Sequence, residues 1–260
     1  MIKLQVVGGG KMGQALLGGL IGAGWAKPGE LLVAEISAQG RGELESLFPG
    51  IVVAESPQTG VDSLIAVKPH IVRQVCEGLI APRRVVSIAA GVTIETMETC
   101  LPDGTPVIRV MPNTPSLVGA GASALAGGRH TSPTDIRWAE SILAAVGEVV
   151  VVDEHLLDAV TGLSGSGPAY VFLIIEAMID AGIAAGLPAD ISSTLAIQTV
   201  LGAAQLASQS DLSPGQLRAG VTTPAGTTAA GLRILEQRAT RAAVIDAVIA
   251  AANRSKEMGS

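Results

Sequence analysis

A glycine-rich run near the amino terminus constrains the fold of this chain most strongly. Residues 8–13 read GGGKMG, a match to GxGxxG, between a predicted strand (residues 3–7) and a predicted helix (residues 13–23). In that context Gly8 allows a tight turn, Gly10 lets the backbone approach a pyrophosphate, and Gly13 lets helix and strand pack closely. The helix N-terminus adds unpaired N–H groups that attract an anion. The run predicts a dinucleotide site; the alternative is a glycine-rich turn without a ligand.

Two neighbours of these glycines, Lys11 and Met12, are further candidates for cofactor contact, although a methionine is more often part of a core. Glu35 follows the second predicted strand, where an acidic residue hydrogen-bonds the ribose 2′-hydroxyl and favours NAD over NADP. The alternative for Glu35 is a solvated strand-end glutamate. Arg41 is close enough in sequence to offer a 2′-phosphate a partner instead.

Two short segments that follow later strands complete the candidate cofactor site. Ligands of doubly wound sheets lie beyond the carboxyl ends of the strands, where small residues let a flat ring approach the backbone. The residues concerned are Val67, Lys68 and Pro69 after one strand, and Ala89, Ala90 and Gly91 after another. Lys68 is expected to touch the cofactor; its alternative is an ordinary surface lysine.

The order of apolar segments predicts two domains of different class. Residues 1–153 alternate strands and helices, which favours βαβ units, a mainly parallel sheet and a Rossmann-like α/β domain. Residues 154–260 are rich in alanine, leucine and isoleucine and predict an all-α domain. The expected strands are residues 3–7, 31–34, 52–53, 63–67, 84–89, 107–110, 121–126 and 147–152. The expected helices are residues 13–23, 41–47, 155–163, 168–185, 188–208, 214–219, 227–237 and 240–253.

The helices of the second domain are apolar almost all round. A surface helix normally carries a polar stripe, so these helices need a cover, and we expect subunits to associate through this half. The apolar run from Tyr170 is interrupted by Glu176 and Asp180, which favours a buried helix over a membrane span. Those two acids are expected at the subunit interface; lining the active site is the alternative.

Charge and composition exclude several classes of partner. The net charge of −6 and the aromatic content of 2% argue against nucleic acid, which needs a basic surface and stacking rings, and against an anionic membrane surface. The sequence has no signal-peptide pattern, so a cytoplasmic location is expected. The three histidines lack metal-ligand spacing, and Cys76 and Cys100 are expected as reduced thiols, so no metal site is predicted.

Six stretches in order along the chain resemble the pyrroline-5-carboxylate reductase family. They are residues 8–19, 67–69, 87–93, 109–115 (RVMPNTP), 163–170 (LSGSGPAY) and 221–228 (VTTPAGTT). The resemblance implies reduction of the cyclic imine 1-pyrroline-5-carboxylate to L-proline, the final step of proline biosynthesis, with NADPH or NADH. It also implies a Rossmann domain followed by a helical dimerisation domain, and a homodimer from which higher oligomers such as a decamer are built.

The resemblance also assigns a substrate loop. It implies that Thr228 lies near the substrate nitrogen as the catalytic residue, and that Thr223, Gly226 and Thr227 lie near the carboxylate. From the residues alone, an ordinary threonine-rich helix cap is the favoured interpretation of this loop, and the resemblance reverses it. The family usually has a glycine where this chain has Ala225, which leaves the loop conformation open. Asp211 matches a position where some relatives carry an acid, and a helix cap is its alternative.

The expected chemistry needs little from the protein beyond positioning. A protonated imine is already electrophilic, whereas reduction of a carbonyl needs a proton donor, usually His, Lys or Tyr. After Lys68 the only lysine is Lys256, and the only tyrosine is Tyr170. The missing lysine argues against a hydroxyacid or ketopantoate type of reductase on the same architecture. A non-catalytic dinucleotide sensor is the other alternative, and the substrate loop argues against it.

Overall fold

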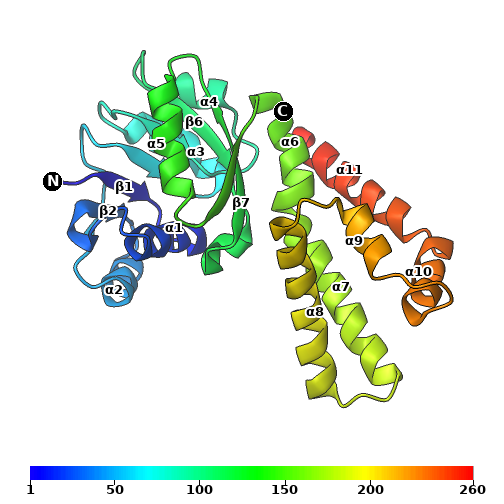
Figure 1. The fold of residues 1–260 in the computed structure, drawn as a ribbon. Helices are drawn as coiled ribbons and strands as arrows, with labels where there is room; N and C mark the ends of the chain where they lie inside the picture. The colour runs from blue at the N-terminus through cyan, green and yellow to red at the C-terminus, as the bar shows by residue number, and fades with distance from the viewer. Residues whose placement is uncertain (260) are drawn as a thin grey trace. The chain divides into compact units, whose positions relative to one another are not determined.

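The computed structural model describes residues 1–259, which form two compact units. The sheet unit comprises residues 1–166 together with the carboxyl-terminal residues from Ile249, and the helical unit comprises residues 167–248. Figure 1 shows strands in the first unit only and helices throughout the second. This arrangement confirms the predicted fold class, a Rossmann-like domain followed by an all-helical part.

The sheet unit is built on a single sheet with the strand order β3-β2-β1-β4-β5-β6-β7-β8. Its strands are β1 (Leu4–Val7), β2 (Leu31–Ala34), β3 (Val52–Ala54), β4 (Ser63–Ile65), β5 (Val85–Ser87), β6 (Val107–Met111), β7 (Gly121–Gly127) and β8 (Gly147–Val151). Every pairing is parallel except β6 with β7. The connection between β6 and β7 is only a short 3₁₀ turn, Thr114–Val118, which is too short for a parallel crossover. The strand reversal therefore follows from the length of this loop.

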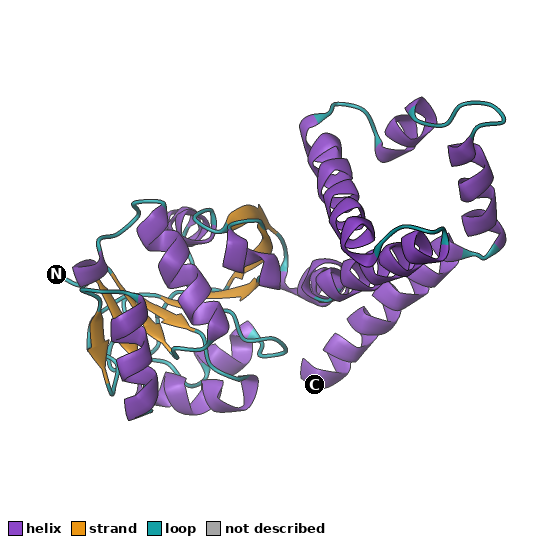
Figure 2. Ribbon diagram, turned by 90° about the horizontal axis from the view of Figure 1, so that it is seen from below, coloured by secondary structure: helices purple, strands orange, loops and turns teal. Residues whose placement is uncertain are grey.

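Helices cover both faces of the sheet (Figure 2). One core cluster contains Leu16 and Leu17 of α1 (Lys11–Gly22) and Ala139 and Ile142 of α5 (Pro133–Leu143). The cluster on the other side takes residues from α3 (Val72–Gly78), α4 (Ile94–Glu98) and α6 (Leu157–Val160). The helix α2 (Ala38–Leu47) contributes Leu44 to the first cluster. Buried strands packed on both sides explain why their sequences are continuous apolar runs.

The helix expected over residues 155–163 is wrong in detail. The structure has a 3₁₀ turn (Glu154–Leu156), then α6, then a π-helical turn (Thr161–Gly165). The Nδ2 of Asn113 donates a hydrogen bond to the carbonyl of Ser164 at 3.1 Å, and Met111 packs against Gly165. The two glycines in residues 161–165 weaken the regular α-helix expected there, since glycine is a poor helix former. The contacts of Ser164 and Gly165 with β6 and the residues after it are consistent with the π-helical turn.

The helical unit contains α7 (Gly167–Ala184), α8 (Ala189–Gln209), α9 (Pro214–Gly220), α10 (Thr227–Gln237) and the first part of α11 (Thr240–Gly259). Helices α7 and α8 form a hairpin (Figure 1), and Ser192 Oγ donates to the carbonyl of Ile179 at 2.7 Å. No residue of α7 is buried in the single chain, and Phe172 is 60% exposed, so the expectation of a buried helix is wrong for the chain alone. Apolar helices without a core of their own need an external cover.

Candidate cofactor and substrate sites

The three glycines of the first motif occupy positions that need glycine or leave room for a ligand. Gly8 has φ +104°, and a Cβ there would lie 2.8 Å from the carbonyl oxygen of Ala66. A Cβ on Gly13 would lie 2.5 Å from the carbonyl oxygen of Gly8. Gly10 is the N-cap of α1 and carries no side-chain cap, and a Cβ on it would meet no other atom within 4 Å. Neighbouring atoms therefore leave no room for a side chain at Gly8 or Gly13. By contrast, the space next to Gly10 at the N-terminus of α1 is free for a ligand.

Glu35 is bound to this glycine loop. Its Oε2 accepts a hydrogen bond from Gly9 N at 3.0 Å, and its Oε1 accepts one from Ser37 N at 2.9 Å. Nη1 of Arg41 donates to the carbonyls of Glu35 and Ile36 at 2.9 and 2.8 Å. The carboxylate is therefore held beside the loop rather than free in solvent, and Nη1 of Arg41 is bound to the backbone.

The remaining cofactor candidates lie at the same edge of the sheet. Val7 pairs with Ile65, and Ile65 pairs with Ser87, so β1, β4 and β5 end side by side. A Cβ on Gly8 would also lie 2.8 Å from Cγ1 of Val67. The residues that follow these strands are Lys11, Met12, Lys68, Pro69, Ala89, Ala90 and Gly91. The structure brings together all the predicted cofactor residues at one carboxyl edge.

This edge fits a nicotinamide dinucleotide. The uncapped N-terminus of α1 offers backbone N–H groups to a pyrophosphate, and the acidic side chain after β2 is placed for a ribose hydroxyl. Residues 89–91 are small, and Gly91 has φ +75°, a backbone conformation that favours glycine. Among residues 1–259, no cluster of three His, Cys, Asp or Glu side chains is arranged to hold a metal ion.

The predicted substrate loop begins α10 in the helical unit. Gly226 is the N-cap, no side chain caps the helix, and Gly226 N donates to the carbonyl of Thr223 at 3.0 Å. Ala225 has φ +60°, which is the conformation that favours the glycine found there in the family. Thr227 and Thr228 are the first two residues of the helix. No threonine side chain caps α10, which argues against the alternative of an ordinary threonine-rich helix cap. The backbone N–H groups of the first turn remain available to an anion.

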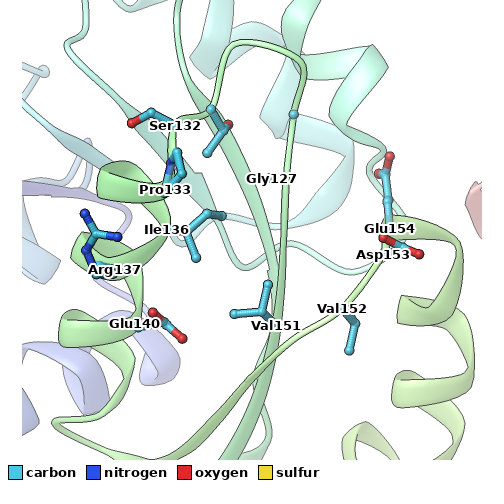
Figure 3. Close-up of a pocket in the computed structure, with 12 residues that line it drawn as sticks. Gly127, Ser132, Pro133, Ile136, Arg137, Glu140, Val151, Val152, Asp153 and Glu154 are labelled. Carbon is cyan, nitrogen blue, oxygen red and sulfur yellow. The ribbon is translucent and has the colours of Figure 1, made fainter.

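Other residues named from the sequence have mainly structural surroundings. Asn113, in the 109–115 stretch, uses Oδ1 to accept from Ala122 N at 2.8 Å as well as donating to the carbonyl of Ser164, so it links the start of β7 to the π-helical turn. Asp211 is exposed in the turn between α8 and α9. A pocket of about 530 Å³ lies between α5 and the end of β8, and none of the predicted site residues lines it (Figure 3).

Sequence reasoning missed one ionic contact within the sheet unit. Arg109 in β6 donates to Glu154 Oε1 at 3.0 Å, and the same oxygen accepts from Ile94 N at 2.8 Å. Arg109 opens the 109–115 stretch, but that stretch gives no partner for its side chain, and Glu154 is 45 residues away in sequence. No local pattern could have indicated their contact.

Comparison with known proteins assigns the family. The chain is 43% identical over 99% of its length to the pyrroline-5-carboxylate reductase of Synechocystis, of which it covers 98%. It has the same identity, over 99% of its length, to the enzyme of that name from Methanosarcina acetivorans. The chain belongs to the pyrroline-5-carboxylate reductase family. Residues 154–258 match the family model for pyrroline-5-carboxylate reductase dimerisation, and residues 3–91 match that of the F420-dependent NADP oxidoreductases.

Solved structures of pyrroline-5-carboxylate reductases have the same fold over the whole chain. The enzyme from Coxiella burnetii is 36% identical, with a TM-score of 0.92 over 100% of this chain and 99% of that one. The enzyme from Plasmodium falciparum, solved with NADP bound, is 32% identical, with a TM-score of 0.85 over 100% of this chain and 98% of the other. The family assignment confirms the resemblance read from the sequence motifs and, with it, a reductase that uses a nicotinamide cofactor.

The family match also bears on the exposed apolar helices. Glu154–Ala184 is long and apolar enough, by length and composition alone, to cross a membrane, and none of its most apolar window is buried in the chain. This stretch lies inside the segment that matches the dimerisation family. The match supports association of subunits through this half of the chain, as the sequence predicted.

Proposed function

We propose that this chain reduces 1-pyrroline-5-carboxylate to L-proline with NADPH or NADH, the final step of proline biosynthesis. The observation that carries the proposal is the 43% identity, over 99% of the chain, to a pyrroline-5-carboxylate reductase. The glycine loop before α1, which fits a dinucleotide, supports it. The absence of a lysine between Lys68 and Lys256 agrees with an imine substrate, since an iminium needs no strong protein acid.

The cofactor is assigned to the carboxyl edge of the sheet. Gly8, Gly10 and Gly13 shape the approach to the N-terminus of α1, where the N–H groups of Lys11 and Met12 face a pyrophosphate. Glu35 accepts from a ribose hydroxyl, a role supported by its position beside Gly9. Val67, Lys68 and Pro69, and Ala89, Ala90 and Gly91, flank the nicotinamide end. The bound reduced nicotinamide supplies the hydride.

The substrate is assigned to the loop before α10. Gly226, as an uncapped N-cap, leaves the first-turn N–H groups for the carboxylate, together with the hydroxyls of Thr223 and Thr227. Thr228 places its hydroxyl near the substrate nitrogen and orients the C=N bond, which makes it the catalytic residue. The protein's main contribution is positioning, because the protonated imine is already reactive toward a hydride.

The functional domains are residues 1–153 for the cofactor and 154–260 for substrate binding and dimerisation, a division supported by the start of the dimerisation match at residue 154. The helical part associates with a second copy. A homodimer, with a decamer as its higher assembly, and a cytoplasmic location complete the proposal. Glu176 and Asp180 are assigned to the subunit interface, where partners compensate for charge within an apolar helix.

The test is a spectrophotometric assay with pyrroline-5-carboxylate and each reduced nicotinamide. We expect loss of reduced-nicotinamide absorbance that depends on the imine and yields proline. A 2-keto acid in place of the imine is the control, and turnover of the keto acid alone would assign the chain to the hydroxyacid type of reductase. No consumption of either coenzyme with the imine would reject the proposed reaction.

A further inference from the structure

The starting observation is a buried cation in the sheet. Arg109 lies in β6 between its β-partners Ser87 in β5 and Ala126 in β7, and its side chain is 9% exposed. A buried guanidinium is costly unless a carboxylate pairs with it. Glu154 supplies that carboxylate at 3.0 Å. The sheet therefore fixes the guanidinium, and the guanidinium fixes the orientation of the Glu154 side chain.

The same carboxylate oxygen has a second partner. Glu154 Oε1 accepts a hydrogen bond from Ile94 N at 2.8 Å. Ile94 is the first residue of α4, so this N–H has no partner within its own helix. The N-cap residue Thr93 accepts from Thr96 N at 3.1 Å, which leaves the Ile94 N–H to Glu154. The residues immediately before Ile94 are 89–93, the loop that contains the candidates for nicotinamide contact.

A second contact joins the segment that contains Glu154 to the last part of α11. Asp158, four residues after Glu154, accepts from Ser255 Oγ at 2.6 Å, and Ser255 is 6% exposed in the last part of α11. A Cβ on Gly91 would lie 3.5 Å from the carbonyl oxygen of Met258, so the end of α11 packs on Gly91. The 89–93 loop thus leads into α4, which Glu154 contacts, and its Gly91 packs against the end of α11, which Asp158 contacts.

We propose that Glu154 is a positioning residue for the cofactor, acting through the backbone of the 89–93 loop. The inference rests on the proposed assignment of Ala89, Ala90 and Gly91 to the nicotinamide end. Arg109 fixes the Glu154 carboxylate through an ion pair, and that carboxylate fixes the backbone N–H of Ile94, the first residue of α4 after the loop. Figure 3 shows Glu154 where the chain leaves β8, with its side chain and that of Val152 extending in opposite directions. Glu154 itself touches neither substrate nor cofactor.

The test is Glu154→Gln in the full-length protein, with two readouts that do not depend on turnover. Direct titration with NADPH and NADH measures the dissociation constant of each coenzyme, and hydrogen exchange measures protection of the peptide that contains residues 89–97 without cofactor. We expect about fivefold weaker binding of both coenzymes, corresponding to about 1 kcal/mol, together with faster exchange in that peptide. The KM for the imine should change by less than about twofold, because the substrate loop lies elsewhere in the chain.

The matched control is Glu148→Gln, which removes the same charge from an exposed position on β8. It should leave coenzyme binding and exchange unchanged. Glu154→Asp is the second variant: it keeps the charge but is one methylene shorter, so it cannot reach both donors, and the same two changes are expected. If Glu154→Gln does not fold, coenzyme binding and hydrogen exchange of Glu154→Asp test the proposal instead.

Unchanged coenzyme affinity and unchanged exchange in the folded variant would overturn the proposal, even with a lower melting temperature, because the pair would then be purely structural. A wild-type protein that binds coenzyme but leaves the imine unreduced would reject the proposed reaction alone. The binding comparison would still decide the role of Glu154.

Discussion

Glu35 and Gly9 are joined by a hydrogen bond of 3.0 Å, so the acidic residue after β2 is fixed against the loop before α1. A carboxylate in this place accepts from a ribose hydroxyl and repels a 2′-phosphate. The neighbouring Arg41 is engaged by two backbone carbonyls, and its Nη2 lies 4.0 Å from Glu55. We therefore expect these local charges to favour NADH over NADPH, a preference that the next experiment tests.

Replacing Glu35 with alanine should weaken the use of NADH more than that of NADPH. We expect kcat/KM for NADH to fall about tenfold, which corresponds to loss of a hydrogen bond to a charged group. NADPH should be affected less, because removal of the negative charge offsets the lost contact. Parallel kinetics with the two coenzymes measure the ratio, and equal losses would reject the ribose contact.

Gly8→Ala should abolish coenzyme binding. The new Cβ would meet the carbonyl of Ala66 at 2.8 Å, in a backbone conformation with φ +104° that L-residues rarely adopt. Gly42→Ala in α2 is the control, since no atom lies within 4 Å of its Cβ position. Titration with NADH should show no saturable binding for the first variant and wild-type affinity for the second. Wild-type affinity in Gly8→Ala would place the cofactor elsewhere.

Ala225→Gly should stabilise the protein. Ala225 has φ +60°, and a left-handed conformation costs an alanine about 1–2 kcal/mol, of which the greater flexibility of glycine when unfolded cancels part. A net gain of about 0.5–1 kcal/mol is expected in denaturant unfolding at fixed subunit concentration. Ala203→Gly in the middle of α8 should instead cost about 1 kcal/mol. A loss of stability in Ala225→Gly would show that the strained loop is compensated by contacts of the alanine methyl.

Cys76 makes stability fall at alkaline pH. Burial raises the pKa of its thiol from 9.0 to about 12, so the unfolded chain loses this proton at lower pH than the folded chain. The stabilisation is fully present below pH 9.0 and is lost progressively as pH rises toward about 12. Chemical unfolding at a series of pH values should show this slope, and Cys76→Ala should reduce it. The same slope in both proteins would assign it to other groups.

The sequence predicted the parts of the fold that depend on local pattern. Residues 8–13 indicated the dinucleotide edge because strand, glycines and helix are contiguous, and the exact bounds of β2 and α10 follow from apolar runs with clear ends. The five-residue helix α4 is too short for helical periodicity to be visible. The antiparallel pairing of β6 with β7 follows from the short loop between them, so the spacing of the predicted strands at residues 107–110 and 121–126 already contained this information.

In the candidate site, too, some residues could be assigned from the sequence and others could not. Gly8, Gly10 and Gly13 could be assigned roles in advance, since backbone geometry at a turn restricts residue type. The contact of Glu154 with Ile94 joins residues 60 positions apart, and only the folded sheet brings them together. The uncapped start of α10 was equally hidden, because the threonines around Gly226 resemble ordinary capping residues.

Thr228→Ala tests the assignment of the substrate loop. Loss of the hydroxyl near the substrate nitrogen should lower kcat/KM for the imine by about tenfold or more, with coenzyme affinity unchanged. Thr194→Ala is the control, since the Thr194 hydroxyl only bonds the carbonyl of Asp190 within α8. Unchanged turnover in Thr228→Ala would remove that residue from its catalytic role.

The most direct test of direct reduction of the imine is an isotope measurement. The chain is supplied with pyrroline-5-carboxylate and reduced nicotinamide carrying deuterium at both C4 positions, and the product is analysed by mass spectrometry. The account predicts proline with one deuterium, located at C5, in ordinary water. Proline without deuterium, or coenzyme oxidation without proline, would contradict it.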